Sequence, residues 1–96
     1  MKQLTILCSS DLADTVRDAL SAAGIQGFLQ LPNAVGNAPS AAAAHGRVPR
    51  WEAEMFVAPV AADAVDGVVD RLRGYAGQCE VEPCLRILVS SLDAVY

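Results

Sequence analysis

Hydrophobic positions along the chain follow two periods, one of two residues and one of three to four. Residues 2–8 and 25–31 are short segments of apolar, β-branched or alternating character, which predicts two strands. Between them, residues 11–23 place apolar side chains three or four apart, which predicts a helix with one buried stripe. We expect Gly24 to end that helix in a left-handed conformation and Pro32 to end the second strand.

The second half of the chain repeats this order of strand, helix and strand. Residues 51–60 alternate and then become apolar on both faces, and residues 84–90 form another short apolar segment, so both are predicted strands. A helix with a valine and leucine stripe is predicted from residue 61 to Gly74 or Gly77. The order predicts an α+β fold: a single ferredoxin-like βαββαβ sandwich over residues 1–96. Its four-stranded antiparallel sheet has order 4-1-3-2 and both helices on one face.

A long segment without hydrophobic periodicity separates the second and third strands. Residues 32–50 are rich in Ala, Gly, Pro and Asn and include four consecutive alanines, which offer little side chain to pack. A loop of this length in a small domain is typical of a binding segment. We therefore predict a mobile, functional loop about 32–50.

Composition suggests an oligomer and excludes several classes of partner. The chain has 96 residues, 53% of them hydrophobic, and a mean hydropathy of +0.32, yet no apolar run reaches the roughly 20 residues that span a bilayer. The excess apolar surface is therefore expected to face other copies of the chain, without direct membrane insertion. No signal sequence is recognisable at residues 1–15, which predicts a cytoplasmic protein. A net charge of −4 without a basic cluster argues against nucleic acid.

Three stretches together resemble the PII-like signalling proteins. They are MKQLTILCSSDLADTVRDALSAAGIQGFLQLPNAVG, the glycine-containing loop that follows, and the ending CLRILVSSLDAVY. The resemblance implies a homotrimer that senses a small effector in the cleft between subunits. It also implies that residues 32–50 act as the effector arm called the T-loop and regulate a partner such as a membrane transporter or efflux pump. The trimeric CutA family shares the architecture, but its long paired hairpin does not resemble GNAPSAAAAHG.

The resemblance also gives candidate effector-binding residues. These are Gly36, Arg47, Arg50 and Arg86, with an adenine nucleotide or a small anion as the effector. The family's phosphate-binding B-loop corresponds here to GYAGQCEVEPC, where Glu80 and Glu82 stand in place of cations. Two carboxylates repel a triphosphate, so ordinary ATP binding is disfavoured. The arginines have an alternative interpretation as solvated surface charge. Divergent PII-like members associated with heavy-metal efflux and with bicarbonate transport are both similar to this chain.

The three cysteines admit a second hypothesis, a small metal-binding or metal-sensing protein. An odd number of cysteines without a secretion signal predicts reduced thiols. In the predicted sheet, Cys8 at the end of the first strand lies near Cys84 at the start of the fourth. Together with Cys79 and the loop residue His45, they form a candidate site for a soft ion such as Cu(I) or Zn(II). The alternative is that Cys8 and Cys84 are core residues and Cys79 and His45 are solvated loop residues.

Catalytic chemistry has little support in the sequence. One histidine and no serine–histidine–aspartate spacing leave no recognisable pair of nucleophile and base. We therefore expect a non-enzymatic protein. Three hypotheses remain: a PII-like regulator, a metal-binding protein, and a module that only scaffolds an assembly.

Overall fold

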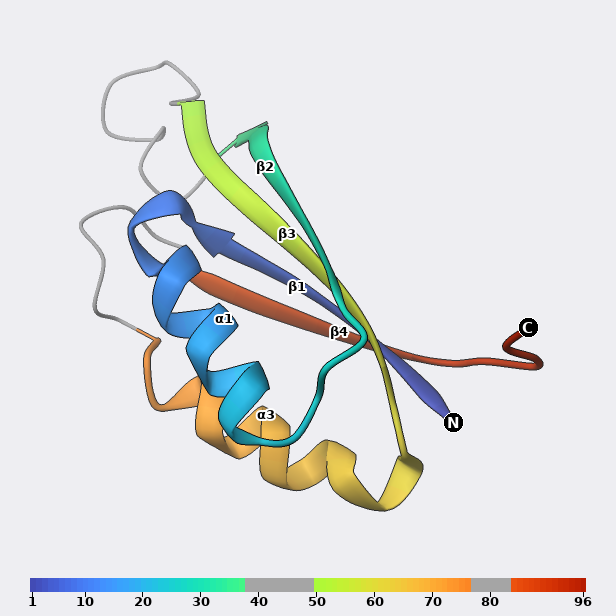
Figure 1. Cartoon of the computed structure of the whole chain (residues 1–96). Helices are drawn as coiled ribbons and strands as arrows, with labels where there is room; N and C mark the ends of the chain where they lie inside the picture. The colour runs from blue at the N-terminus through green and yellow to red at the C-terminus, as the bar shows by residue number, and fades with distance from the viewer. Residues whose placement is uncertain (38–49, 77–83) are drawn as a thin grey trace.

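The predicted order of strands and helices is present in the computed structural model, which describes residues 1–37, 50–76 and 84–96 (Figure 1). The strands are β1 (Lys2–Ser9), β2 (Leu29–Asn37), β3 (Arg50–Val60) and β4 (Leu85–Ser91), and the helices are α1 (Ala13–Ala22) and α3 (Val65–Arg73). Short 3₁₀ helices at Ser10–Leu12 and Ala62–Ala64 precede α1 and α3. All neighbouring strands are antiparallel in the order β2-β3-β1-β4. The predicted fold class and strand order are confirmed.

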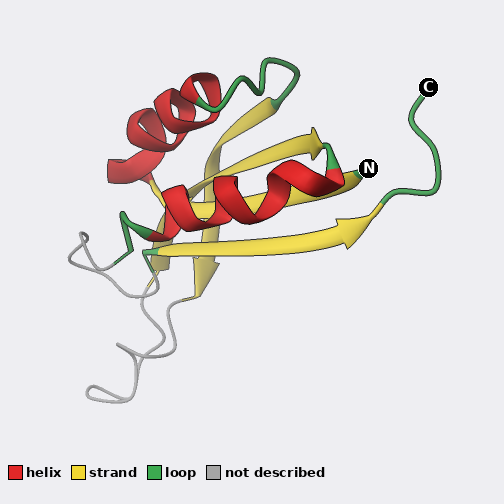
Figure 2. Cartoon of the chain, turned by 90° about the horizontal axis from the view of Figure 1, so that it is seen from below, coloured by secondary structure: helices red, strands yellow, loops and turns green. Residues whose placement is uncertain are grey.

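Both helices cover the same face of the sheet and enclose the hydrophobic core (Figures 1 and 2). Ile6 of β1, Phe56 of β3, Leu20 of α1 and Leu72 of α3 are fully buried. Ile6 and Phe56 are register partners, and the Phe28 ring lies against Phe56 with 5.9 Å between ring centroids. These side chains alternate with exposed or half-buried neighbours along the strands, so the two-residue period correctly separated the two faces.

Helix α1 ends as its sequence predicts, at Gly24. This glycine has a φ of 82°, in the left-handed region. Its N–H donates to the carbonyl of Ser21 at 3.0 Å, and the Ile25 N–H donates to the carbonyl of Leu20 at 3.0 Å. The two bonds satisfy the last carbonyl groups of the helix and direct the chain toward β2.

Strand β2 begins and ends later than predicted. Ile25 and Phe28 both pack against the helix-side core. A regular strand places residues three apart on opposite faces, so residues 25–28 form a connection and the predicted strand 25–31 begins only at Leu29. Pro32 does not end the strand: the pairing with β3 shifts register between Leu31 and Ala34 and then continues to Asn37. Proline is tolerated there because β2 is an edge strand with a bulge. The part of the predicted loop from residue 38 to residue 49 lies outside the described residues.

The other face of the sheet is free of helices and is mostly apolar, with Arg86 at its β4 edge. One row across the four strands is formed by Leu31, Met55, Leu7 and Arg86, and the next row by Leu29, Val57, Thr5 and Leu88. Leu29 is 67% exposed and Leu88 is 51% exposed. We call these two rows the open sheet face. An apolar surface of this kind on a small domain is typical of a contact between subunits.

Candidate functional site

A groove lies between α3 and the outer edge of β4. It has a volume of about 420 Å³ and is lined by apolar side chains of both elements and by two arginines. Leu85, Ile87 and Val89 of β4 form one side, and Val69 of α3 forms the other. We call this the α3–β4 groove. Apolar walls with a few polar groups are typical of a ligand pocket in this size range.

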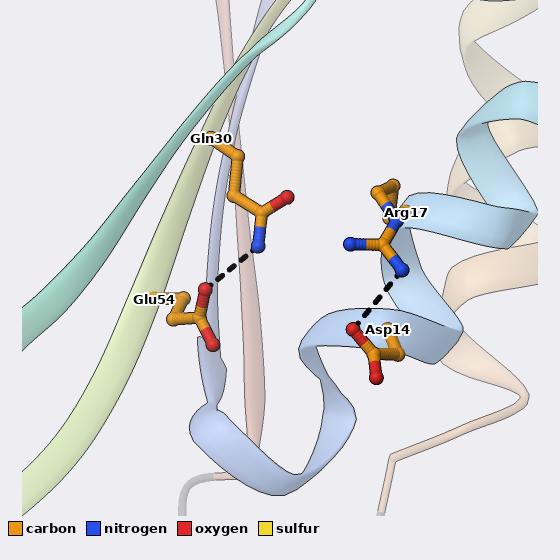
Figure 3. Close-up of polar contacts among 4 residues, drawn as sticks. All are labelled: Asp14, Arg17, Gln30 and Glu54. Atoms are coloured by element: carbon orange, nitrogen blue, oxygen red, sulfur yellow. Dashed lines mark hydrogen bonds and ion pairs between the residues drawn. The ribbon is translucent and has the colours of Figure 1, made fainter.

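Two arginines border the groove: Arg73 on the helix side, and Arg86 at the edge that the groove shares with the open sheet face. Arg73 comes from the last turn of α3, and Arg86 is the second residue of β4. Arg17 and Asp14 form a salt bridge at 3.1 Å (Figure 3). Neither groove arginine has an ion-pair partner among the residues that the structure describes. A guanidinium group binds carboxylate or phosphate oxygens through paired hydrogen bonds. The groove therefore fits an anion that carries an apolar part.

A second, smaller hollow lies beside the bulge of β2. It has a volume of about 210 Å³ and is lined in part by Ser10, Asn33 and Glu52. Asn33 belongs to the β2 bulge and has a φ of 63°, a conformation that asparagine tolerates better than most residues. The hydroxyl, amide and carboxylate groups suit a ligand with hydroxyl or amino groups.

The structure describes three of the four predicted effector residues: Gly36, Arg50 and Arg86. Gly36 and Arg50 lie in the last rungs of the β2–β3 ladder, where Gly36 pairs with Trp51 and Asn37 pairs with Arg50. Arg86, the second residue of β4, pairs with Leu7 of β1, in the row of Met55, so β1 and β3 separate it from β2 within one chain. Arg47 lies outside the described residues. The structure thus brings Gly36 and Arg50 together and places Arg86 apart from them.

The structure gives no support to the metal hypothesis. Cys8 is a buried free thiol, and Cys84 is disulfide-bonded, so the prediction that all thiols are reduced is wrong for Cys84. Cys79 and His45 lie outside the described residues. Within residues 1–37, 50–76 and 84–96, no group of three His, Cys, Asp or Glu side chains is placed to hold a metal ion. The predicted proximity of the two strand ends is confirmed, because the Ser9 N–H donates to the Cys84 carbonyl at 2.9 Å.

The thiol of Cys8 is held in its protonated form. Burial raises its pKa to about 11, and the neighbouring Glu54 carboxylate adds to this effect. Glu54 is itself positioned by Gln30, whose Nε2–H donates to Glu54 Oε1 at 2.7 Å (Figure 3). Metal binding and thiol oxidation require the thiolate, so Cys8 is poorly suited to either role.

Alkaline pH is expected to destabilise the chain through Cys8. The unfolded thiol loses its proton near pH 9, whereas the folded one keeps it to about pH 11. The stabilisation is therefore fully present below pH 9 and is lost as pH rises through 11, by about 2–3 kcal/mol. Urea unfolding between pH 8 and 11 measures this loss, and Cys8→Ala should show a shallower decline than the parent chain. Equal declines in both proteins would contradict the assignment.

Most residues of these hollows were not predicted as site residues, among them the charged or polar residues Arg73, Asn33 and Glu52. The Pro32–Asn33 dipeptide is a turn signal and could have located the bulge. Arg73 carries no such signal, because its position beside β4 follows only from how the helix packs on the sheet. The alternating pattern of residues 51–55 predicted Glu52 only as a polar strand position, and Glu52 does lie in β3.

The chain has the fold of the nitrogen regulatory PII-like proteins, and the resemblance predicted from the sequence is confirmed at this level. The apo form of one of them, CPII from Thiomonas intermedia K12, matches with a TM-score of 0.71 and 17% identity over 93% of this chain and 85% of that chain. CPII bound to ADP, AMP and bicarbonate matches with a TM-score of 0.66 and 16% identity over 99% of this chain and 94% of that chain.

A third solved structure, CPII bound to ADP, AMP and acetate, matches with a TM-score of 0.68 and 18% identity over 92% of this chain and 81% of that chain. No protein-family model matches the sequence, and no curated protein matches it either. In the part of the chain that the structure describes, neither helix has the length and apolar character needed to cross a bilayer.

Proposed function

We propose that this chain is a PII-like regulatory protein that binds a small anionic effector and changes the activity of a partner protein. The observation that carries the proposal is the match of almost the whole chain to CPII, which was solved with ADP, AMP and bicarbonate or acetate. Arg86 and Arg73 supply cationic groups that an effector of this chemistry requires. The role is regulatory rather than catalytic.

The effector is an adenine nucleotide with one or two phosphates, or a small carboxylate or bicarbonate anion. Arg86 binds its charged end, and Gly36, Arg47 and Arg50 come from a neighbouring subunit. This division between subunits is supported by the distance across the sheet, since two strands separate β4 from β2 within one chain. Glu80 and Glu82 in the sequence oppose the additional charge of ATP.

The functional assembly is a homotrimer in which the open sheet faces pack together. Burial of several hundred Å² of apolar surface contributes several kcal/mol at about 25 cal/mol per Å². Leu29, Leu31 and Leu88, each more than 40% exposed in the single chain, are the residues that gain most. In this assembly, residues 38–49, between β2 and β3, contact the partner, a membrane transporter or efflux pump.

Removal of the Arg86 guanidinium is expected to weaken effector binding by about tenfold or more, because a charge-assisted hydrogen bond is lost. Isothermal titration calorimetry of the parent chain and Arg86→Ala with ADP and with AMP, in bicarbonate buffer, measures this difference. Arg17→Ala is the matched control, because Arg17 is an exposed arginine on α1 paired with Asp14. Equal affinities for the parent and Arg86→Ala would remove Arg86 from the site, and no heat with any ligand would contradict the proposed function.

A further inference from the structure

One end of the sheet narrows to two strands. β1 pairs with β3 only as far as Ser9, the partner of Ala53, whereas β2 and β3 continue for three more rungs, formed by residues 35–37 and 50–52 (Figure 1). We call these three rungs the β2–β3 ribbon. Because a two-stranded ribbon is only marginally stable by itself, its position depends on contacts with the rest of the domain.

Three polar residues meet where this ribbon joins the body of the domain. Glu52 lies in the first rung of the ribbon, and Ser10 directly follows the last residue of β1 that pairs with β3. Asn33 belongs to the β2 bulge, with its φ of 63°. All three line the hollow of about 210 Å³ beside the bulge. A ligand in this hollow therefore contacts the ribbon and the body at once.

The polar groups of Asn33 and Glu52 are not used elsewhere in the described part of the chain. Neither side chain forms an ion pair or a side-chain hydrogen bond with another described residue. Glu54, two positions further along the same face of β3, differs from Glu52 because its carboxylate accepts the hydrogen bond from Gln30. The Glu52 carboxylate therefore keeps its charge and its acceptor oxygens for a ligand.

The lining of the hollow is complementary to a small organic cation. Glu52 supplies a negative charge, Ser10 and Asn33 supply a hydroxyl and an amide oxygen, and no described lining residue is basic. Ala34 and Val35 add a short apolar surface. At about 30 Å³ for each water molecule, the volume corresponds to about seven waters, which suits a ligand of about six heavy atoms. A primary ammonium group on a short chain fits these features, because it donates hydrogen bonds only.

We propose that this hollow binds a small primary amine, such as an amino alcohol, and that the bound amine fixes the β2–β3 ribbon on the body of the domain. The ammonium group donates to the Glu52 carboxylate, and the hydroxyl group bonds to Ser10 or Asn33. Glu52 shares its face of β3 with the core residue Phe56, so the hollow lies on the helix-covered side, away from the open sheet face. The ligand has the opposite charge to the proposed effector and uses other residues, so the inference goes beyond the proposed function.

NMR titration of the ¹⁵N-labelled parent chain with 4-amino-1-butanol tests the site, and 1,4-butanediol is the neutral compound of equal size. We expect the amine to shift the amide signals of Ser10, Asn33 and Glu52 and to bind about three- to fivefold more tightly than the diol, as for an exposed ion pair. Trp51, the single tryptophan of the chain, lies in the ribbon beside Glu52, so its fluorescence should change over the same concentrations. Equal affinities for the two compounds, or no shift at these residues, would overturn the proposal.

Two charge-neutralising variants test the role of Glu52. Glu52→Gln keeps the shape of the side chain and should lower the affinity for the amine to that for the diol. Asp18→Asn is the matched control, because it neutralises an exposed carboxylate on α1 that does not line the hollow, and it should leave the affinity unchanged. Unchanged affinity in Glu52→Gln, or an equal loss in both variants, would overturn the proposal. ADP titration of the parent chain tests the proposed function separately.

Asn33→Gly tests the contribution of the bulge. Glycine adopts a φ of 63° without strain, so the variant keeps the backbone and loses only the amide group. We expect weaker binding of 4-amino-1-butanol and amide shifts that remain at Ser10 and Glu52. Loss of these shifts while Glu52→Gln binds normally would place the amine elsewhere and would overturn the proposal.

Discussion

Phe56→Ala is expected to lower the free energy of unfolding by about 3–5 kcal/mol, a large part of the stability of a domain of this size. The Phe56 side chain is fully buried at the centre of the sheet, with Ile6 beside it and the Phe28 ring against it. Its removal leaves a cavity that these rigid neighbours fill only in part. Urea unfolding followed by circular dichroism measures the loss.

Two further variants test whether the loss of stability comes from the cavity or from any substitution in this pair of rings. Phe56→Leu retains most of the apolar volume and should cost about 1–2 kcal/mol. Phe28→Ala removes the other ring of the pair, but because Phe28 is only partly buried, its loss should be smaller than that of Phe56→Ala. If Phe56→Ala costs less than about 1 kcal/mol, the core is not organised around this residue.

Met55→Asp is expected to convert the proposed trimer into a folded monomer. Met55 lies in the middle of the open sheet face, with Leu31 on one side and Leu7 on the other. In the single chain the new carboxylate remains in contact with water, whereas in an assembly of sheet faces it would be buried without a partner. Burial of an unpaired charge costs several kcal/mol per subunit, of the same order as the stabilisation expected from burial of the apolar face.

Sedimentation equilibrium at micromolar concentration detects the change, and circular dichroism checks that the monomer is folded. Ala22→Glu is the matched control, because Ala22 is exposed at the end of α1 and lies outside the open sheet face. It introduces a carboxylate without changing that face and should leave the oligomeric state unchanged. If Met55→Asp sediments like the parent chain, the open sheet face is not the contact between subunits.

The topology could be predicted from the sequence because each element carries a clear period and a clear boundary. Gly24 shows this best: a glycine directly after an apolar stripe predicted a left-handed helix end, and the structure has φ 82° there. The approach of Cys8 to Cys84 followed from strand order alone. In contrast, the limits of β2 depend on which edge of the sheet it occupies, because an edge strand tolerates Pro32 and an inner strand would not.

The candidate site was less predictable than the fold. Arg86 was expected as a site residue, but its neighbour Arg73 is 13 positions away in the sequence and reaches the groove only through the packing of α3 beside β4. The bonded state of Cys84 was also missed, since composition and spacing do not report whether a thiol is oxidised. The cysteine hypothesis depended on reactive thiols, and the burial of Cys8 removes one of them.

The central claim is that the chain forms a PII-like trimer that binds a nucleotide or a small anion. The most direct test is native mass spectrometry of the parent chain with ADP and AMP in a volatile bicarbonate buffer. One spectrum reports the number of 10.0 kDa chains and the number of bound ligands in each assembly. We expect a three-chain species that carries nucleotide. Arg86→Ala should still form the three-chain species, with less nucleotide bound. A single-chain species without ligand at all nucleotide concentrations would contradict it.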